Sequence, residues 1–220
     1  MLVAGVDEAG RGCVVGPLVV AGIAVQAENL PLLVELGVKD SKLLTAKKRE
    51  SLFPEIIKLA EKHQVIKVPP AQIDKVVRSN RTLHKLNRLE AETMAKIIGF
   101  LRPDKVYVDA ADVMEQRFGF HIKECLQIKT KIISQHKADR TFPVVSAASI
   151  IAKVERDAEI AKLKNKYGDF GSGYLTDEKT MVFLKRLLNG NGDYPSCVRK
   201  SWKPAQRARS EHGTTQKTLI

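Results

Sequence analysis

Two apolar segments near the start of the chain have the length and composition of buried β-strands. Residues 2–7 and 14–26 are rich in Val and Ile, and their apolar character is continuous rather than alternating, which is typical of a sheet covered on both faces. The turn GRGC joins them. The longer run is too short to span a bilayer, which takes about 20 residues. Because Asp7 and Glu8 stand where a signal peptide would be basic, we expect neither a targeting signal nor a membrane association.

The rest of the chain alternates helical patterns with short strands. An apolar stripe predicts a helix over 82–101, and a long helix is expected at about 143–167. Thr45 suits the N-cap of a helix over 45–62, in which Pro54 is expected to disturb the middle. Further strands are expected at 63–68, 105–110 and 128–134, and a further helix near 177–189. The pattern contains no internal repeat and no linker, and it predicts an α/β fold.

The charge balance indicates the kind of partner. The 220 residues include 37 Lys and Arg against 25 Asp and Glu, a net charge of +12. This excess suits a protein that binds a polyanion, but by itself it suits a protein with a generally basic surface equally well. Aromatic residues make up 5%, too few to grip a single strand by base stacking. We therefore expect contacts to the phosphates and sugars of a duplex. We expect the cations of the C-terminal tail to bind this duplex; they are Arg199, Lys200, Lys203, Arg207, Arg209 and Lys217.

Cysteine usage points to a reducing compartment. Cys13, Cys125 and Cys197 are odd in number and far apart, so neither a disulfide framework nor a zinc site is indicated. We expect a cytoplasmic protein.

Four acidic residues occupy positions where an ordinary surface carboxylate is not expected. Asp7 and Glu8 end a hydrophobic strand, Asp109 ends the strand KVYVD, and Asp139 lies between a strand and a helix. Strand ends of an α/β sheet converge on the edge where ligands bind. Carboxylates gathered there repel one another unless a cation is present, and oxygen ligands favour Mg²⁺ or Mn²⁺ over zinc.

Each acid also has a structural explanation. Asp7 fits a buried salt bridge, Asp139 fits a loop ion pair, and Asp109 competes with Asp112, which suits an N-cap. Successive strand residues point to opposite faces. Glu8 therefore joins its neighbour at one metal only if the strand ends or bulges there.

The sequence motifs, taken together, resemble those of type 2 ribonuclease H (ribonuclease HII), in its archaeal form. The motifs, in family order, are DEAGRG (7–12), DSK (40–42), VDAAD (108–112), HKAD (136–139), FPVVSAASI (142–150) and GSGY (171–174). The resemblance implies a ribonuclease H-like fold: a mixed five-stranded sheet flanked by helices, as a catalytic domain over 1–175, with a helical, basic C-terminal extension over 176–220.

The resemblance also implies roles for individual residues. The metal-binding and catalytic acids correspond to Asp7, Glu8, Asp109 and Asp139, which decides between Asp109 and Asp112. The ribose-sensing elements correspond to Gly10, Arg11, Gly12 and Tyr174, and Lys42 corresponds to a phosphate contact. Glycines beside a cation also suit close backbone approach to a phosphate or a ribose hydroxyl, although a tight turn between strands uses them too.

The activity implied is hydrolysis of the RNA strand of RNA–DNA hybrids, and of single ribonucleotides embedded in duplex DNA. Two Mg²⁺ or Mn²⁺ ions would serve the reaction, which leaves 5′-phosphate and 3′-hydroxyl ends. The alternatives are a type 3 ribonuclease H and a non-catalytic duplex-binding protein of the same fold. We expect a monomer. The final residues QKTLI resemble the start of a sliding-clamp binding peptide, with Gln216 followed three residues later by Leu219.

Overall fold

The computed structural model describes residues 1–38, 44–80, 84–191 and 193–218, with the backbone alone at 190, 191 and 211–218. Its strands are β1 (Leu2–Ala9), β2 (Leu18–Gln26), β3 (Lys62–Val68), β4 (Lys105–Asp109) and β5 (Lys131–Gln135). Its helices are η1 (Ala27–Asn29), α1 (Leu30–Glu35), α2 (Ala46–Leu59), α3 (Pro70–Val77), α4 (Lys85–Leu101), α5 (Glu115–Glu124), α6 (Ala138–Thr141), α7 (Pro143–Tyr167), α8 (Glu178–Asn191) and α9 (Lys203–Thr218). In the described part of the chain, no helix has the length and apolar content needed to cross a membrane.

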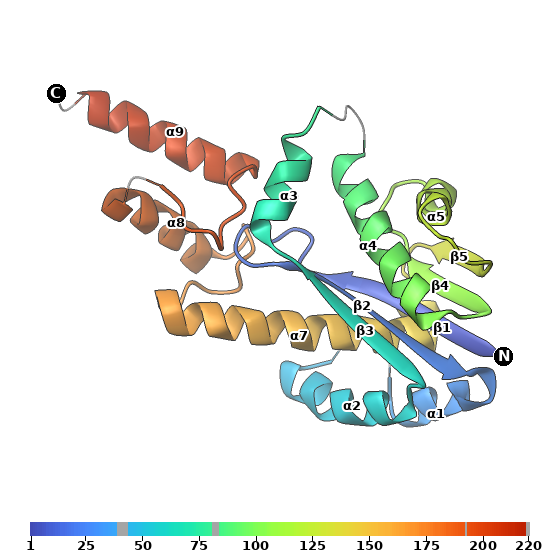
Figure 1. The fold of residues 1–220 in the computed structure, drawn as a ribbon. Coiled ribbons are helices and arrows are strands. Elements are labelled where there is room, and N and C mark those ends of the chain that lie inside the picture. The colour runs from blue at the N-terminus through green and yellow to red at the C-terminus, as the bar shows by residue number, and fades with distance from the viewer. Residues whose placement is uncertain (39–43, 81–83, 192, 219–220) are drawn as a thin grey trace. The chain divides into compact units, whose positions relative to one another are not determined.

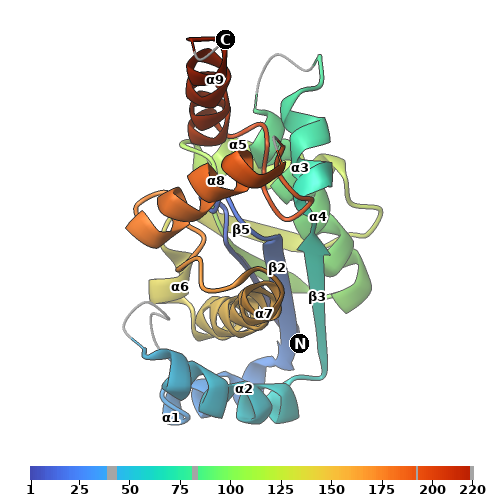
Figure 2. The same ribbon diagram turned by 90° about the vertical axis from the view of Figure 1, so that its left-hand side faces the viewer.

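The chain divides into two compact units, shown together in Figures 1 and 2. The sheet unit comprises Met1–Ala9, Val19–Lys67 and Thr82–Arg156, and the helical unit comprises Gly10–Leu18, Val68–Arg81 and Asp157–Ile220. The division expected after residue 175 stays a prediction.

The sheet unit is built on one mixed sheet. Among the described residues, five strands follow the order β3-β2-β1-β4-β5. β1 pairs antiparallel with β2 and parallel with β4, and β4 pairs parallel with β5. This confirms the predicted fold class, because one antiparallel neighbour beside two parallel pairings is a mixed sheet.

Two glycines allow helices to pack closely on opposite faces of this sheet. A Cβ at Gly5 of β1 would lie 2.3 Å from the backbone of Val144 in α7. A Cβ at Gly22 of β2 would lie 2.5 Å from Ile97 in α4. Gly22 pairs with Val6, whose side chain points away from the Gly5 face because strand residues alternate. Helix α4 therefore covers one face and α7 the other, and Figure 1 shows α4 on the opposite side of the strands from α1 and α2.

Most expected elements are confirmed, and the exceptions have local causes. The helix expected over 143–167 has those bounds, and Thr45 caps α2 by accepting a hydrogen bond of 3.2 Å from the Lys48 N–H. Helix α2 nevertheless runs unbroken through Pro54. The strand expected from residue 14 begins at Leu18, because Gly16 has a φ of +95° and interrupts the extended backbone.

Candidate active site

Two of the predicted acids leave the same edge of the sheet on adjacent strands. Val6 of β1 pairs with Val108 of β4, so the next residues, Asp7 and Asp109, stand side by side. Paired positions share a face of the sheet. Asp7 follows Gly5 by two residues and therefore lies on the face that α7 covers.

Asp7 is buried in surroundings that disfavour its charged form. Burial, and after it the negative charge of Asp109, raise the pKa of Asp7 to about 7. The ammonium of Lys153, the Ser149 hydroxyl and the backbone N–H of Glu8 act in the opposite direction. The last of these donates to Asp7 Oδ1 over 2.7 Å. The carboxylate is thus oriented by its own strand and by α7, and a nearby cation would favour its ionised form.

Asp109 connects the sheet to the segment that carries Asp139. Its Oδ1 accepts a hydrogen bond of 2.9 Å from the backbone N–H of Ala138. Lys137, just before it, has a φ of +55°, a left-handed conformation rare in residues with a Cβ, and it turns the chain into α6. Asp139 is buried within α6, so this hydrogen bond joins the end of β4 to the residue before Asp139.

Glu8 departs from the expected geometry. The β1–β2 pairing is regular through Asp7, Glu8 and Ala9, and the strand ends at Ala9, one residue after Glu8. A bulge or strand end at Glu8 was the condition for Glu8 to share a metal with Asp7, and the regular pairing within β1 does not meet it. The side chains of Asp7 and Glu8 leave opposite faces of the strand. Among the described residues, no three His, Cys, Asp or Glu side chains are grouped so that they could hold a metal ion. The four-acid metal site stays a prediction.

Asp112 supports the start of a helix, as the sequence suggested, but it is not itself the N-cap residue. Its carboxylate binds the Arg117 guanidinium and accepts a 3.0 Å hydrogen bond from the N–H of Met114, the N-cap of α5. The Arg117 hydrogen bond, above all, holds the pKa of Asp112 well below its usual range. Asp112 thus supports the start of α5 from two residues before the cap.

The glycine turn and the predicted tyrosine meet within the helical unit. Gly10 has a φ of +87°, and the Cys13 N–H donates to its carbonyl over 3.3 Å, which closes a turn over residues 10–13. Cys13 forms a β-bridge with Tyr174. The tyrosine ring borders Gly12, where an added Cβ would lie 3.8 Å from it. The predicted ribose-sensing elements are therefore neighbours.

Hydrogen bonds from the Arg199 side chain stabilise this turn, a role that was not predicted from the sequence. The fully buried guanidinium donates to the carbonyls of Gly10 and Arg11 over 2.7 Å each, and to that of Gly16 over 3.2 Å. It also lies 5.0 Å from the ring centre of Trp202. The prediction that Arg199 contacts a duplex is wrong, because its side chain is enclosed by protein. Its place in the basic run RKSWK gave no signal of this.

Three predicted contact residues have no described side chain. Lys42 and Leu219 lie outside the described residues, and Gln216 falls in the part of α9 described by its backbone alone.

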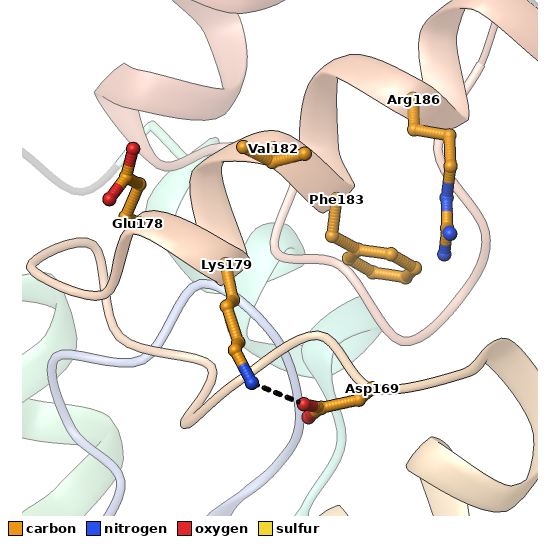
Figure 3. Close-up of a pocket in the computed structure, with 6 residues that line it drawn as sticks. All are labelled: Asp169, Glu178, Lys179, Val182, Phe183 and Arg186. Carbon is orange, nitrogen blue, oxygen red and sulfur yellow. Dashed lines mark hydrogen bonds and ion pairs between the residues drawn. The ribbon is translucent and has the colours of Figure 1, made fainter.

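A shallow pocket beside α8 is separate from the predicted site residues. It has a volume of about 430 Å³ and is lined by Asp169, Glu178, Lys179, Val182, Phe183 and Arg186 (Figure 3). Asp169 is already paired with Lys179 at 2.8 Å and with Lys164 at 3.0 Å. None of the predicted acids lines this pocket, so it offers no metal chemistry of the expected kind.

Comparison with known proteins agrees with the motifs. The family model for ribonuclease HII matches residues 4–205. Ribonuclease HII of Thermococcus onnurineus is 47% identical over 209 residues, covering 94% of this chain and 89% of the relative. The crystal structure of ribonuclease H2 from Pyrococcus horikoshii OT3 superposes with a TM-score of 0.89 at 45% identity, over 97% of this chain and 99% of that one. A structure of the PCNA:RNase HII complex from Archaeoglobus fulgidus contains a chain with a TM-score of 0.83 and 45% identity, over 92% and 96% of the two chains.

Fold, motif order and similarity therefore lead to one assignment. The mixed sheet and the strand-end acids agree with it, as does the glycine turn beside Tyr174. Because the family match extends from the first strand into α9, it covers both units of the structure. On this evidence the chain belongs to the ribonuclease HII family.

Proposed function

We propose that this protein, a ribonuclease H endonuclease of RNA–DNA hybrids by its family, also cuts duplex DNA at single ribonucleotides, and that a divalent metal supports both reactions. The observation that carries the proposal is the pair formed by Asp7 and Asp109 on adjacent strands. The pKa of Asp7 is raised to about 7 there. A buried carboxyl beside a second acid is a costly arrangement that a cation relieves.

The chemistry of the predicted donors fits Mg²⁺ or Mn²⁺. Asp7, Glu8, Asp109 and Asp139 offer carboxylate oxygens, which hard divalent ions prefer. These four carboxylates would hold two such ions, which would supply activation of a water and stabilisation of the leaving 3′ oxygen, and the products would carry 5′-phosphate and 3′-hydroxyl ends. The backbone of Glu8 and the residues of α7 orient Asp7, and the N–H of Ala138 orients Asp109.

The turn over 10–13 and Tyr174 are proposed to recognise the ribose. Only the 2′-hydroxyl distinguishes RNA from DNA at a given position. Backbone groups at Gly10, Arg11 and Gly12 can approach it closely because the glycines carry no side chain. The Tyr174 ring borders Gly12, which supports a shared contact to one sugar. Lys42 is proposed to contact a phosphate.

Replacing single acids tests the catalytic assignment. Asp7→Asn and Asp139→Asn should each abolish Mg²⁺-dependent cleavage while binding of the duplex is kept, because the neutral amide keeps the shape and loses the metal-binding charge. Glu55→Gln is the matched control, since Glu55 forms an exposed ion pair with its helix neighbour Lys58 at 2.9 Å on α2. Unchanged cleavage in both aspartate variants would falsify the assignment.

A comparison of two substrates, a hybrid and a duplex with one embedded ribonucleotide, separates the remaining alternatives. A type 3 ribonuclease H cuts a duplex with one embedded ribonucleotide poorly, whereas a non-catalytic duplex-binding protein cuts no substrate. We expect efficient cleavage of this duplex as well as of a hybrid.

We also propose that the C-terminus binds a sliding clamp. The chain from Archaeoglobus fulgidus that resembles this one was solved as a PCNA:RNase HII complex, and Gln216 and Leu219 have the spacing of a clamp-binding peptide. Deletion of residues 216–220 should abolish capture by an archaeal clamp and leave cleavage of a free duplex intact. Capture that survives the deletion contradicts this assignment.

A further inference from the structure

A second pocket in the helical unit has a basic rim and is lined by residues other than those of the glycine turn. It has a volume of about 410 Å³ and is lined by Ala71, Asp74, Lys75, Arg78, Ser196, Val198 and Lys200. Its walls are α3 and the segment 196–200 that precedes α9, and Figures 1 and 2 both show α3 beside this segment. We call it the α3 pocket.

Asp74 fastens the two walls together. Its carboxylate is buried and accepts hydrogen bonds of 2.9 Å from the backbone N–H groups of both Lys200 and Ser201. The Ser201 hydroxyl donates a third, of 2.5 Å. Because three donors bind this carboxylate, Asp74 joins α3 to the segment before α9 and stabilises the walls of the pocket that it lines.

The rim of the pocket is positively charged. Lys75 and Arg78 are exposed and stand three residues apart, hence on the same side of α3. Within the described part of the chain, neither has an ion-pair partner. Lys200, on the facing wall, contacts Asp193 at 2.9 Å. Favourable placement near a helix C-terminus accounts for one cation on α3. It does not account for two exposed cations, Lys75 and Arg78, at the same pocket.

The pocket wall is continuous with the support of the ribose-sensing turn. Lys200 directly follows Arg199, whose guanidinium holds the carbonyls of Gly10 and Arg11. The backbone of Arg199 is fixed as well, since its N–H donates to the Val14 carbonyl over 2.8 Å. An anion in the α3 pocket would therefore sit at a fixed offset from the turn.

We propose that the α3 pocket binds a backbone phosphate of the substrate duplex, other than the phosphates of the nucleotide that the turn recognises. This inference rests on the proposed function, and it adds an anchor outside the family motifs. Lys75 and Arg78 supply the charge, and Asp74 holds the pocket open. A phosphate group carries the charge that this rim complements, and a duplex presents such groups at regular spacing.

The test is a steady-state cleavage assay with the double variant Lys75→Gln, Arg78→Gln on a long duplex with one central ribonucleotide. We expect KM to rise about tenfold with kcat unchanged, because two exposed charge-assisted contacts are lost from binding alone. The slope of log(kcat/KM) against log[salt] should become shallower by about 1 to 2. Arg78→Lys alone should keep the wild-type salt slope.

Shortening the duplex supplies a second, sharper readout. Trimming one flank pair by pair should raise KM of the wild type abruptly when the phosphate that occupies the pocket is removed. The double variant should lack this step. The matched control is Lys96→Gln, Lys185→Gln, which removes the same charge from exposed positions outside the pocket. It should retain the step.

The outcomes separate this proposal from the proposed function. If the wild type cuts no ribonucleotide-containing duplex, the proposed function itself fails. If the wild type cuts normally while the double variant keeps its KM, salt slope and trimming step, the pocket proposal alone is overturned. An equal change in the control variant also overturns it, because the effect then belongs to net charge.

Discussion

Asp7 should make the metal-free protein less stable as the pH rises. Its pKa is about 7 in the folded chain, against an ordinary value of 3.8. Between these values the unfolded chain has released this proton and the folded chain still binds it, so stability falls as pH rises. The contribution is fully present below about pH 4 and is lost as the pH passes through about 7.

The size of the effect follows from the same shift. About three pKa units at 1.36 kcal/mol each amount to roughly 4 kcal/mol as an upper value. Asp7→Asn removes this titration and keeps an oxygen for the Glu8 N–H that now donates over 2.7 Å. In EDTA at pH 8 the variant should therefore unfold up to roughly 8–16 °C above the wild type, given about 2–4 °C per kcal/mol for a chain of this size. At pH 4 the two should nearly coincide.

Thermal unfolding from pH 4 to pH 8.5, with EDTA and with excess Mg²⁺, measures this directly. Mg²⁺ should raise the wild-type Tm at pH 8, because an ion that binds only the folded state stabilises it. The Asn variant should lose most of that response and also lose cleavage. A Tm difference independent of pH, or a variant less stable than the wild type at pH 8 in EDTA, would refute the reasoning.

Three further changes test how the fold positions the site. Arg199→Lys should lower kcat/KM on a single-ribonucleotide duplex about tenfold, because one ammonium cannot replace the guanidinium hydrogen bonds to the carbonyls of Gly10 and Arg11. If the Mg²⁺-induced Tm shift is unchanged, the loss belongs to the turn and not to the metal site. An unchanged kcat/KM would contradict the positioning role. Gly5→Ala should cost about 3 kcal/mol or more in denaturant unfolding, since its Cβ would lie 2.3 Å from the Val144 backbone; a loss below 1 kcal/mol would contradict this packing. Thr45→Ala should cost about 1 kcal/mol by the same assay without affecting cleavage, and no loss would show that the cap contributes little.

Periodicity predicted the regular elements well and failed where burial had another cause. The helix over 143–167 was predicted with its observed bounds, and the apolar stripe predicted for 82–101 lies in α4, Lys85–Leu101. Val14 and Val15 looked like strand residues because they are apolar, yet they belong to the core of the helical unit with Phe170 and Leu184. An apolar run reports burial, and burial does not require a strand.

Helix α3 escaped prediction for a related reason. Pro69 and Pro70 mark a break in the chain, but Pro70 is the first residue of the helix, where its missing N–H costs nothing. The helix has 8 residues, too few for a periodic signal. Lys75 and Arg78 therefore appeared only as isolated cations of a basic chain.

Some features of the candidate site could be predicted from the sequence and others could not. The strand end at Asp109 and its neighbourhood to Asp7 could be predicted from the sequence, because parallel strands place their ends at one edge, although β1 continues two residues beyond Asp7. The role of Arg199 could not, because its three acceptors are carbonyls of residues more than 180 positions earlier. Backbone acceptors leave no residue-type signature.

One cleavage assay tests the central claim most directly. Three matched duplexes of the same sequence are compared, with and without Mg²⁺: all DNA, DNA with one embedded ribonucleotide, and an RNA–DNA hybrid. We expect cleavage of the hybrid and of the single-ribonucleotide duplex in Mg²⁺ only, with 5′-phosphate and 3′-hydroxyl products, and no cleavage of DNA. Cleavage without a divalent ion, or an intact single-ribonucleotide duplex beside a cut hybrid, would contradict the proposed metal chemistry or ribose recognition, respectively.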